Sequence, residues 1–180
     1  MVRERADLRE ALIREAIVML GAGEADLSLR SVARAAGVSA MAPYRHFSDK
    51  AALLGAVAAQ GFAELRQDLE RADAGADAAD ALVDQGLAYI AFAQRRPSLF
   101  RLMFASADLA CIPHEAGRGA YEILARRVGG VAPHLGDLGS LACWGMVHGL
   151  ATLRLDRRID AEPEDLRAAL VLLTQAFAKR

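Results

Sequence analysis

Residues 28–54, SLRSVARAAGVSAMAPYRHFSDKAALL, constrain the fold of this 180-residue chain more than any other segment. Apolar side chains recur there at i, i+3, i+4 and i+7, the spacing of one helix face: Leu29, Val32, Ala33 and Ala36. Gly37 follows and supplies the positive φ that a tight turn needs. Val38 fits the angle between two helices and Ser39 has the chemistry of an N-cap, so a second helix is expected to begin at Ala40. Together these features predict a helix-turn-helix, which indicates duplex DNA as a partner.

Pro43 is an unusual residue for the second helix of such a motif. Counted from Ser39 as the N-cap, it occupies the fourth helical position, just past the first turn in which proline is harmless. Proline removes one backbone N–H donor. The recognition helix is therefore expected to start with an irregular or 3₁₀ turn.

The rest of the chain is expected to be helical. Apolar residues recur at spacings of three and four, and no long β-branched alternation interrupts them. The expected helices cover 7–21, 50–69, 78–94, 97–104, 114–128, 138–155 and 163–178. Ser48 is the expected N-cap of the helix at 50–69, with Asp49 at its positive end. The fold class is all-α, with a three-helix DNA-binding domain at 1–52 and a C-terminal helical domain at 53–180.

Charge and apolar patterning exclude several kinds of protein. The net charge is −1 overall, +1 for residues 1–50 and −2 for the rest, so DNA affinity has to come from individual cations, helix N-termini and two copies of the site. No apolar stretch approaches the roughly 18 residues that span a membrane, and MVRERADLRE places charges where a signal peptide needs an apolar core. Cys111 and Cys143 have no metal-ligand spacing and indicate a reducing compartment. A cytoplasmic location without a membrane partner is expected.

Two motifs carry a resemblance to a known family. Tyr44, His46, Phe47 and Lys50 form the pattern Tyr-x-His-Phe-x-x-Lys directly after the helix-turn-helix. With one helix before it and a larger helical region after it, this arrangement resembles the TetR-type transcriptional regulators. The run Trp144-Gly-Met-Val-His-Gly149 is similar to the Trp…His-Gly signature in the C-terminal domain of one TetR subgroup. The resemblance implies a homodimeric DNA-binding regulator that needs no cofactor.

The expected DNA contacts lie in and around the recognition helix. The small or flexible side chains of Ala40, Met41 and Ala42 can meet thymine methyl groups in the major groove. The family motif implies that Tyr44, His46 and Lys50 contact backbone phosphates. Arg45 is the candidate for direct reading of guanine, with a phosphate contact as the alternative. The remaining DNA-binding candidates are Ser28, Arg30 and Ser39. Phe47 is expected to be a core residue.

The C-terminal half contains candidates for an effector pocket and for a dimer interface. Such pockets are mostly apolar with a few polar groups, and a buried structural role is the alternative for each member. The pocket candidates are Phe92, Phe100, Met103, Phe104, Trp144 and His148. Helical faces in the last two helices look like the four-helix dimer seam of the family or, alternatively, an intramolecular core. These faces carry Leu150, Leu153, Leu166, Leu170, Leu173 and Phe177.

Catalytic chemistry has no support in the sequence. The histidines His46, His114, His134 and His148 lie far apart and lack metal-ligand companions, so neither a metal site nor a catalytic residue is expected. Both cysteines are expected to be buried, inert thiols. The leading hypothesis is a repressor that binds a pseudo-palindromic operator and is released by an unknown small-molecule effector. The alternatives are a DNA-binding protein switched by a protein partner and a helical protein-interaction regulator without a small-molecule effector.

Overall fold

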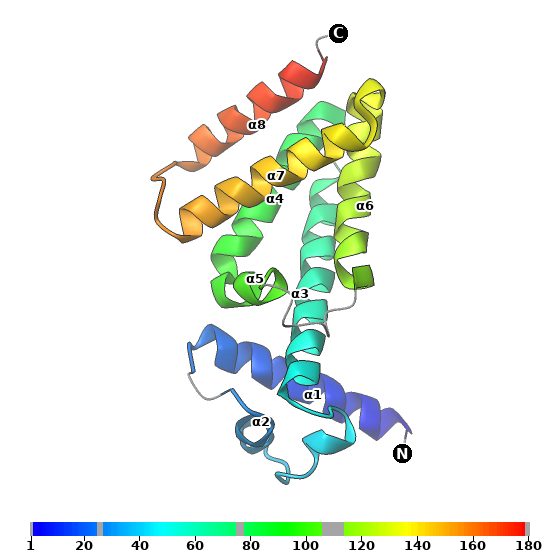
Figure 1. The fold of residues 1–180 in the computed structure, drawn as a ribbon, viewed down its shortest axis with the longest axis vertical. Coiled ribbons are helices and arrows are strands. Elements are labelled where there is room, and N and C mark those ends of the chain that lie inside the picture. The colour runs from blue at the N-terminus through cyan, green and yellow to red at the C-terminus, as the bar shows by residue number, and fades with distance from the viewer. Residues whose placement is uncertain (1, 25–26, 75–77, 106–113, 179–180) are drawn as a thin grey trace. The chain divides into compact units, whose positions relative to one another are not determined.

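The computed structural model describes residues 2–24, 27–74, 78–105 and 114–178, and Figure 1 shows their arrangement. Within these ranges every regular element is a helix, which confirms the all-α prediction. The elements are α1 (Val2–Gly21), α2 (Leu29–Ala35), the 3₁₀ helix η1 (Pro43–Arg45), α3 (Lys50–Ala72), α4 (Ala78–Arg95), α5 (Pro97–Met103), α6 (His114–Val131), the 3₁₀ helix η2 (Pro133–Leu135), α7 (Gly136–Leu155) and α8 (Pro163–Ala178).

Most predicted helices agree with the observed ones to within a few residues. α8 has the predicted bounds, whereas α1 begins five residues earlier than expected, at Val2, and η2 was not predicted. η2 starts at Pro133, whose fixed φ suits the first position of a helix.

The chain forms two compact units, and α3 begins in the first and ends in the second. The first unit comprises Met1–Phe62 and Arg96–Ala116, and the second comprises Ala63–Arg95 and Gly117–Arg180. The functional boundary predicted at residue 52 lies inside α3 and stays a prediction.

The core of the first unit forms where α1 packs against α2 and α5. Leu12, Ile13, Ala16 and Ile17, which form two i, i+4 pairs on one side of α1, are buried. Val32 and Ala33 of α2 complete this core and are fully buried. Burial of these side chains fixes α2, and hence the start of the helix-turn-helix, on α1.

The core of the second unit forms where α4 packs against α7 and α8. Gly86 of α4 permits this close approach, because a Cβ there would lie 2.8 Å from Leu170 Cδ1 and 3.2 Å from Val147 Cγ1. Leu166 and Leu170 are buried within the chain, and Leu173 and Phe177 pack on an apolar cluster of Leu82, Val128 and Cys143. The alternative of an intramolecular core therefore describes Leu166 and Leu170, whereas Leu173 and Phe177 are only partly buried.

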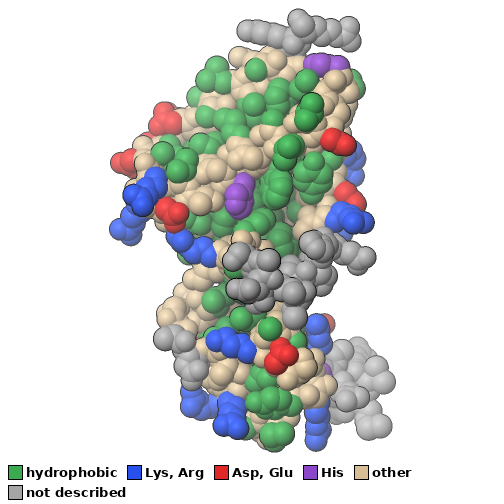
Figure 2. All heavy atoms as spheres, viewed as in Figure 1, with side chains coloured by type: hydrophobic (Ala, Val, Ile, Leu, Met, Phe, Trp, Pro, Cys, Tyr) green, Lys and Arg blue, Asp and Glu red, His purple; other side chains and the backbone are tan. Residues whose placement is uncertain are grey.

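A different set of α7 and α8 side chains forms an exposed apolar face. Figure 2 shows hydrophobic side chains gathered over this part of the second unit. The large exposed members are Leu138, Leu141, Leu153 and Leu172. Gly145 and Gly149 of α7 face open space, since a Cβ at either would meet no atom within 4 Å. We call this surface, made by these four leucines and two glycines, the α7–α8 face.

Candidate functional site

Ser28 holds the N-terminus of α2 in place. Its backbone N–H donates to Ser31 Oγ over 2.8 Å, and the Ser31 N–H donates to Ser28 Oγ over 3.1 Å. This reciprocal pair is a capping box, which satisfies two backbone donors at the start of the helix. Ser28, a predicted DNA contact, thus also has a structural role, as the N-cap of α2.

The predicted glycine turn is confirmed. Gly37 has φ of +69°, and the Val38 N–H donates to the Ala33 carbonyl over 3.0 Å. A hydrogen bond to the carbonyl five residues back, together with a residue in the left-handed conformation, is the Schellman motif that ends a helix. Glycine is needed at this position because a Cβ would be strained at such a φ.

The α-helix predicted to begin at Ala40 is not present. Turns occupy residues 40–42, and the only helical element between α2 and α3 is the 3₁₀ helix η1. Pro43 is the physical reason, because it has no N–H to donate to the Ser39 carbonyl. The Ala42 N–H takes that carbonyl instead over 2.9 Å, and the His46 N–H donates to the Pro43 carbonyl over 2.9 Å, both with 3₁₀ spacing.

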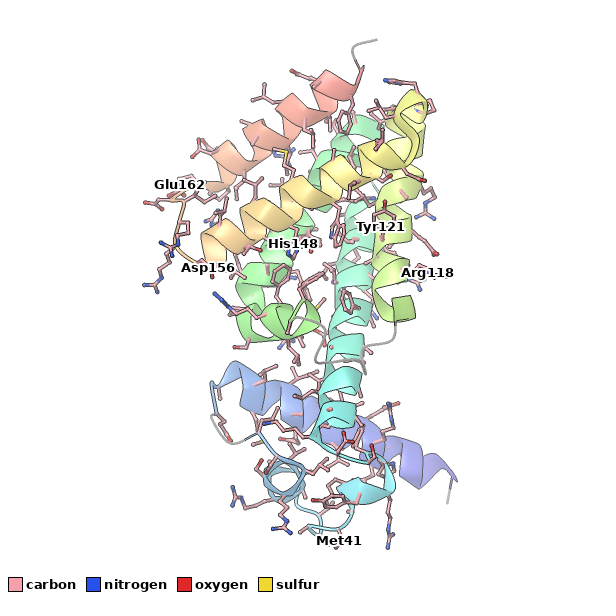
Figure 3. The ribbon with its side chains drawn as sticks, viewed as in Figure 1. Met41, Arg118, Tyr121, His148, Asp156 and Glu162 are labelled. Atoms are coloured by element: carbon pink, nitrogen blue, oxygen red, sulfur yellow. The ribbon has the colours of Figure 1, made fainter. Side chains whose placement is uncertain are left out.

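Several predicted DNA contacts are exposed on this segment. Met41 is 68% exposed and lies at the tip of the segment that follows α2, as Figure 3 shows, and Tyr44 is 43% exposed. Among the other candidates, Arg30, Ser39, Ala40, Arg45 and Lys50 are exposed, and Ser28, Ala42 and His46 are partly buried. The structure therefore brings Met41, Tyr44 and Arg45 together on one short, exposed stretch of chain.

Phe47 and Pro43 anchor this stretch to the core. Phe47 is 3% exposed, which confirms the core role predicted for it, and Pro43 is fully buried. The guanidinium of Arg9 in α1 lies over the Phe47 ring, 5.5 Å from its centroid. The sequence did not indicate Arg9, because the contact joins residues far apart along the chain.

Asp49, and not the predicted Ser48, caps α3. The Ala52 N–H donates to Asp49 Oδ1 over 2.8 Å, and the Ser48 hydroxyl donates to Asp49 Oδ2 over 3.1 Å. These two bonds, the first above all, hold the pKa of Asp49 below its usual range. A carboxylate accepts from the N-terminal amides and interacts favourably with the helix dipole, which explains why it takes the cap position.

In the second unit, Tyr89 connects Trp144 and His148. Its hydroxyl lies 2.9 Å from His148 Nδ1 and also accepts the indole N–H of Trp144. Tyr89 is buried, and burial raises its pKa, while burial lowers the pKa of His148. Trp144 also contacts the ring of Tyr121 edge-on, with 6.1 Å between ring centroids. No sequence motif indicated Tyr89 or Tyr121, although Tyr89 lies on the buried face of α4 with a polar group that needs partners.

The predicted pocket residues are divided between the two units. Phe92, Trp144 and His148 belong to the second unit. Phe100, Met103 and Phe104 belong to the first, where Phe104 packs against Phe100 and edge-on against Phe62. Phe92 is fully buried in α4, in keeping with the structural alternative, and the pocket role of the set stays a prediction.

A charged cluster joins three helices of the second unit. Asp73, at the end of α3, accepts from Arg127 Nε of α6 over 2.7 Å and from Gln85 Nε2 of α4 over 2.5 Å. Arg127 also donates to the Asp73 carbonyl over 3.0 Å, and Arg126 lies 3.5 Å from the carboxylate. The Arg127 hydrogen bond is the main reason that the pKa of Asp73 is below its usual range. No sequence motif indicated this cluster.

Three further features of the described part of the chain concern metal ligands, membrane-spanning helices and the buried thiol. Among the described residues no group of His, Cys, Asp or Glu could hold a metal ion, and no described helix is long and apolar enough to cross a membrane. Cys143 is buried, and burial raises the pKa of its thiol to about 11. Cys111 lies outside the described residues.

Two family models match this chain. Residues 12–57 match the model of bacterial regulatory proteins of the tetR family, and residues 82–177 match the C-terminal domain of tetracyclin repressor-like proteins. No curated protein matches the sequence at a significant level.

Solved structures share the fold over nearly the whole chain. A protein of unknown function from Rhodococcus sp. RHA1 is 31% identical, with a TM-score of 0.77 and 96% of each chain covered. A TetR family transcription regulator from Marinobacter aquaeolei VT8 is 18% identical, with a TM-score of 0.69 and all of each chain covered. A TetR variant from Acinetobacter baumannii AYE, solved in complex with minocycline, is 22% identical, with a TM-score of 0.62 and 93% of this chain and 92% of that chain covered.

Proposed function

Because this chain belongs to the TetR family of transcriptional regulators and is a DNA-binding regulator, we propose that it acts as a homodimeric repressor of a pseudo-palindromic operator. In this proposal a small molecule bound in the C-terminal domain releases the protein from DNA. The exposed stretch that carries Met41, Tyr44 and Arg45 is the observation on which the proposal depends most.

The chemistry of this stretch suits both parts of DNA recognition. The Tyr44 hydroxyl and the Lys50 ammonium are donors for phosphates, which set the position of the protein on the duplex. Arg45 can bind guanine with two hydrogen bonds, and Met41 offers an apolar contact to a thymine methyl. Buried Pro43 and Phe47 fix the backbone from which these side chains extend.

The α7–α8 face supports the homodimer. Exposed leucines on adjacent helices are unusual at the surface of a monomer, and Gly145 and Gly149 leave room for another helix to approach. A second copy of the same face would cover it in a two-fold interface. Two DNA-binding units held in this way would read half-sites about 34–36 Å apart in successive major grooves.

Release by an effector would be a shift between two populations. A ligand that binds better to the arrangement with the wrong half-site spacing lowers DNA affinity by its differential binding free energy, and DNA lowers ligand affinity by the same factor. The match to the tetracyclin repressor-like C-terminal domain and the relative that binds minocycline support a ligand in the second unit.

The decisive experiment is selection of bound duplexes from a random library by the purified protein, followed by titration of the enriched site at two salt concentrations. We expect an inverted repeat whose affinity falls steeply with salt, because phosphate contacts release counterions. Absence of enrichment would instead support a helical protein-interaction regulator.

A further inference from the structure

The side-chain amide of Gln85 is held in one orientation. Its Nε2 donates to Asp73 Oδ1, and the same oxygen accepts from Arg127 Nε. The lowered pKa of Asp73 keeps the carboxylate ionised at neutral pH, so it only accepts hydrogen bonds. If the amide were rotated by 180°, its Oε1 would face the Asp73 carboxylate, and the two oxygens would repel each other. Gln85 Oε1 therefore has to face away from Asp73.

Among the residues that the structure describes, this oxygen has no hydrogen-bond partner. Gln85 is 3% exposed, and its Oε1 is a buried acceptor without a donor. Leaving such an acceptor unpaired costs about 1–3 kcal/mol, so native proteins rarely keep one without a reason.

The neighbours of Gln85 on α4 are apolar or aromatic. Residues three and four positions apart share a helix face, which places Gln85 between Leu82 and Tyr89. Leu82 belongs to the apolar cluster with Val128 and Cys143, and Tyr89 carries the hydrogen bonds to Trp144 and His148. Apart from Asp73 and Arg127 at the Nε2 side of its amide, Gln85 thus has apolar and aromatic neighbours, which suit a donor carried by an otherwise apolar molecule.

We propose that Gln85 Oε1 accepts a hydrogen bond from a hydroxyl or N–H group of an apolar effector, and that the Asp73–Arg127 pair is what aims it. The proposal rests on the proposed function of the second unit as a ligand-binding domain. It names the chemistry of the ligand: one hydrogen-bond donor on an apolar frame. Arg127 and Asp73 are positioning residues in this scheme, because they act through Gln85.

Phenol and toluene are suitable probes, since they have the same number of heavy atoms and differ in the donor. Trp144 is the one tryptophan of the chain, so its fluorescence, together with calorimetry, reports binding to the second unit of the full-length protein. Gln85→Met removes the acceptor at similar volume. Gln94→Met is the matched control, because Gln94 is exposed on the same helix. Asp73→Asn keeps Gln85 but removes the anion that orients it.

We expect wild type and Gln94→Met to prefer phenol over toluene, and Gln85→Met to lose about tenfold of this preference, the effect of one hydrogen bond. Asp73→Asn is expected to reduce the preference as well, which a merely structural glutamine would not do. An unchanged phenol-to-toluene ratio in Gln85→Met would overturn the proposal.

Three further results separate this proposal from the proposed function. Equal binding of both probes by wild type refutes the role of Gln85 and leaves a ligand-binding domain in place. Binding of neither probe refutes the role of Gln85 and counts against a ligand site in this unit, whereas operator selection still tests DNA binding on its own. A crystal structure with phenol bound, in which a water molecule remains on Oε1, also overturns the proposal.

Discussion

Arg127 binds Asp73 twice, through Nε to the carboxylate over 2.7 Å and through Nη2 to the backbone carbonyl over 3.0 Å. The two residues lie 54 positions apart, and the pair fastens α6 to the end of α3. Both side chains are largely buried, at 24% and 16% exposure, so water screens the interaction only partly.

Asp73→Asn should lower the free energy of unfolding by about 2 kcal/mol at pH 7, the typical worth of a hydrogen bond to a charged group. Because the folded pKa lies below the unfolded value of 3.8, this contribution is complete above that value and is lost as pH falls through the folded pKa. Urea unfolding at pH 7 and pH 3 measures the difference between variant and wild type. Glu70→Gln, which breaks the exposed pair with Arg66, is the control and should cost under about 0.5 kcal/mol. A difference that does not shrink at low pH would contradict the assignment.

His148→Gln should remove part of the acid sensitivity of the fold. Burial lowers the pKa of His148 in the folded state, so the unfolded chain takes up a proton first as pH falls below 6.5. Wild-type stability should therefore decrease from pH 6.5 downward until the folded pKa is reached, and the variant should show a shallower slope. Thermal unfolding at half-unit steps of pH tests this, with His134→Gln at an exposed position as the control. Equal slopes for wild type and His148→Gln would rule the effect out.

Tyr44→Phe and Lys50→Ala should weaken binding to all duplexes alike, because phosphate contacts carry no base information. Lys50→Ala should also reduce the slope of log affinity against log salt by about 1. Titration of the selected operator and of an unrelated duplex gives both values. Arg14→Ala, an exposed cation on α1, is the control and should change neither. Loss of affinity for the operator alone would mean that these residues read bases.

Arg45→Ala should relax base preference at one position of each half-site, with a loss of roughly 1–3 kcal/mol of discrimination if Arg45 binds guanine through two hydrogen bonds. Arg45→Lys is the informative companion, since lysine keeps the charge and loses the paired geometry. Repeating the duplex selection with each variant shows which base position changes. Uniform weakening by Arg45→Ala, with full recovery in Arg45→Lys, would assign Arg45 to a phosphate.

Leu172→Asp should dissociate the proposed dimer. Leu172 is 67% exposed on the α7–α8 face, and a two-fold interface contains it twice, so the expected loss is about 3 kcal/mol or more of dimerisation free energy. Sedimentation equilibrium measures the change. Arg118→Asp also introduces an aspartate, with the loss of a cation, at an exposed position of α6 and should leave the dimer intact. If Leu172→Asp stays dimeric, the interface lies elsewhere.

The parts of the fold and of the site that the sequence predicted correctly depend on features within a few residues of one another. The stripe through Val32 and Ala33, the turn at Gly37 and the core role of Phe47 each depend on periodicity or on the chemistry of one residue, and the structure confirms them. The segment around Pro43 is where the prediction from neighbouring residues was incomplete. An irregular or 3₁₀ start was predicted from this residue, and η1 confirms it, but no α-helix follows η1 before α3.

The sequence by itself determined the family and, apart from the helix expected at Ala40, the α-helices with their approximate ends, since helix periodicity, caps and the Tyr44–Lys50 motif act over a few residues. Only the tertiary structure decided which side chains meet. The bond between Tyr89 and His148 joins residues 59 positions apart, and the contact of Gln85 with Asp73 joins α4 to the end of α3. Such pairs depend on how helices pack, and packing is set by the shapes of many buried side chains at once. The same packing left Gln85 Oε1 buried with no donor among the described residues, a feature that no pattern of residues along the chain predicts.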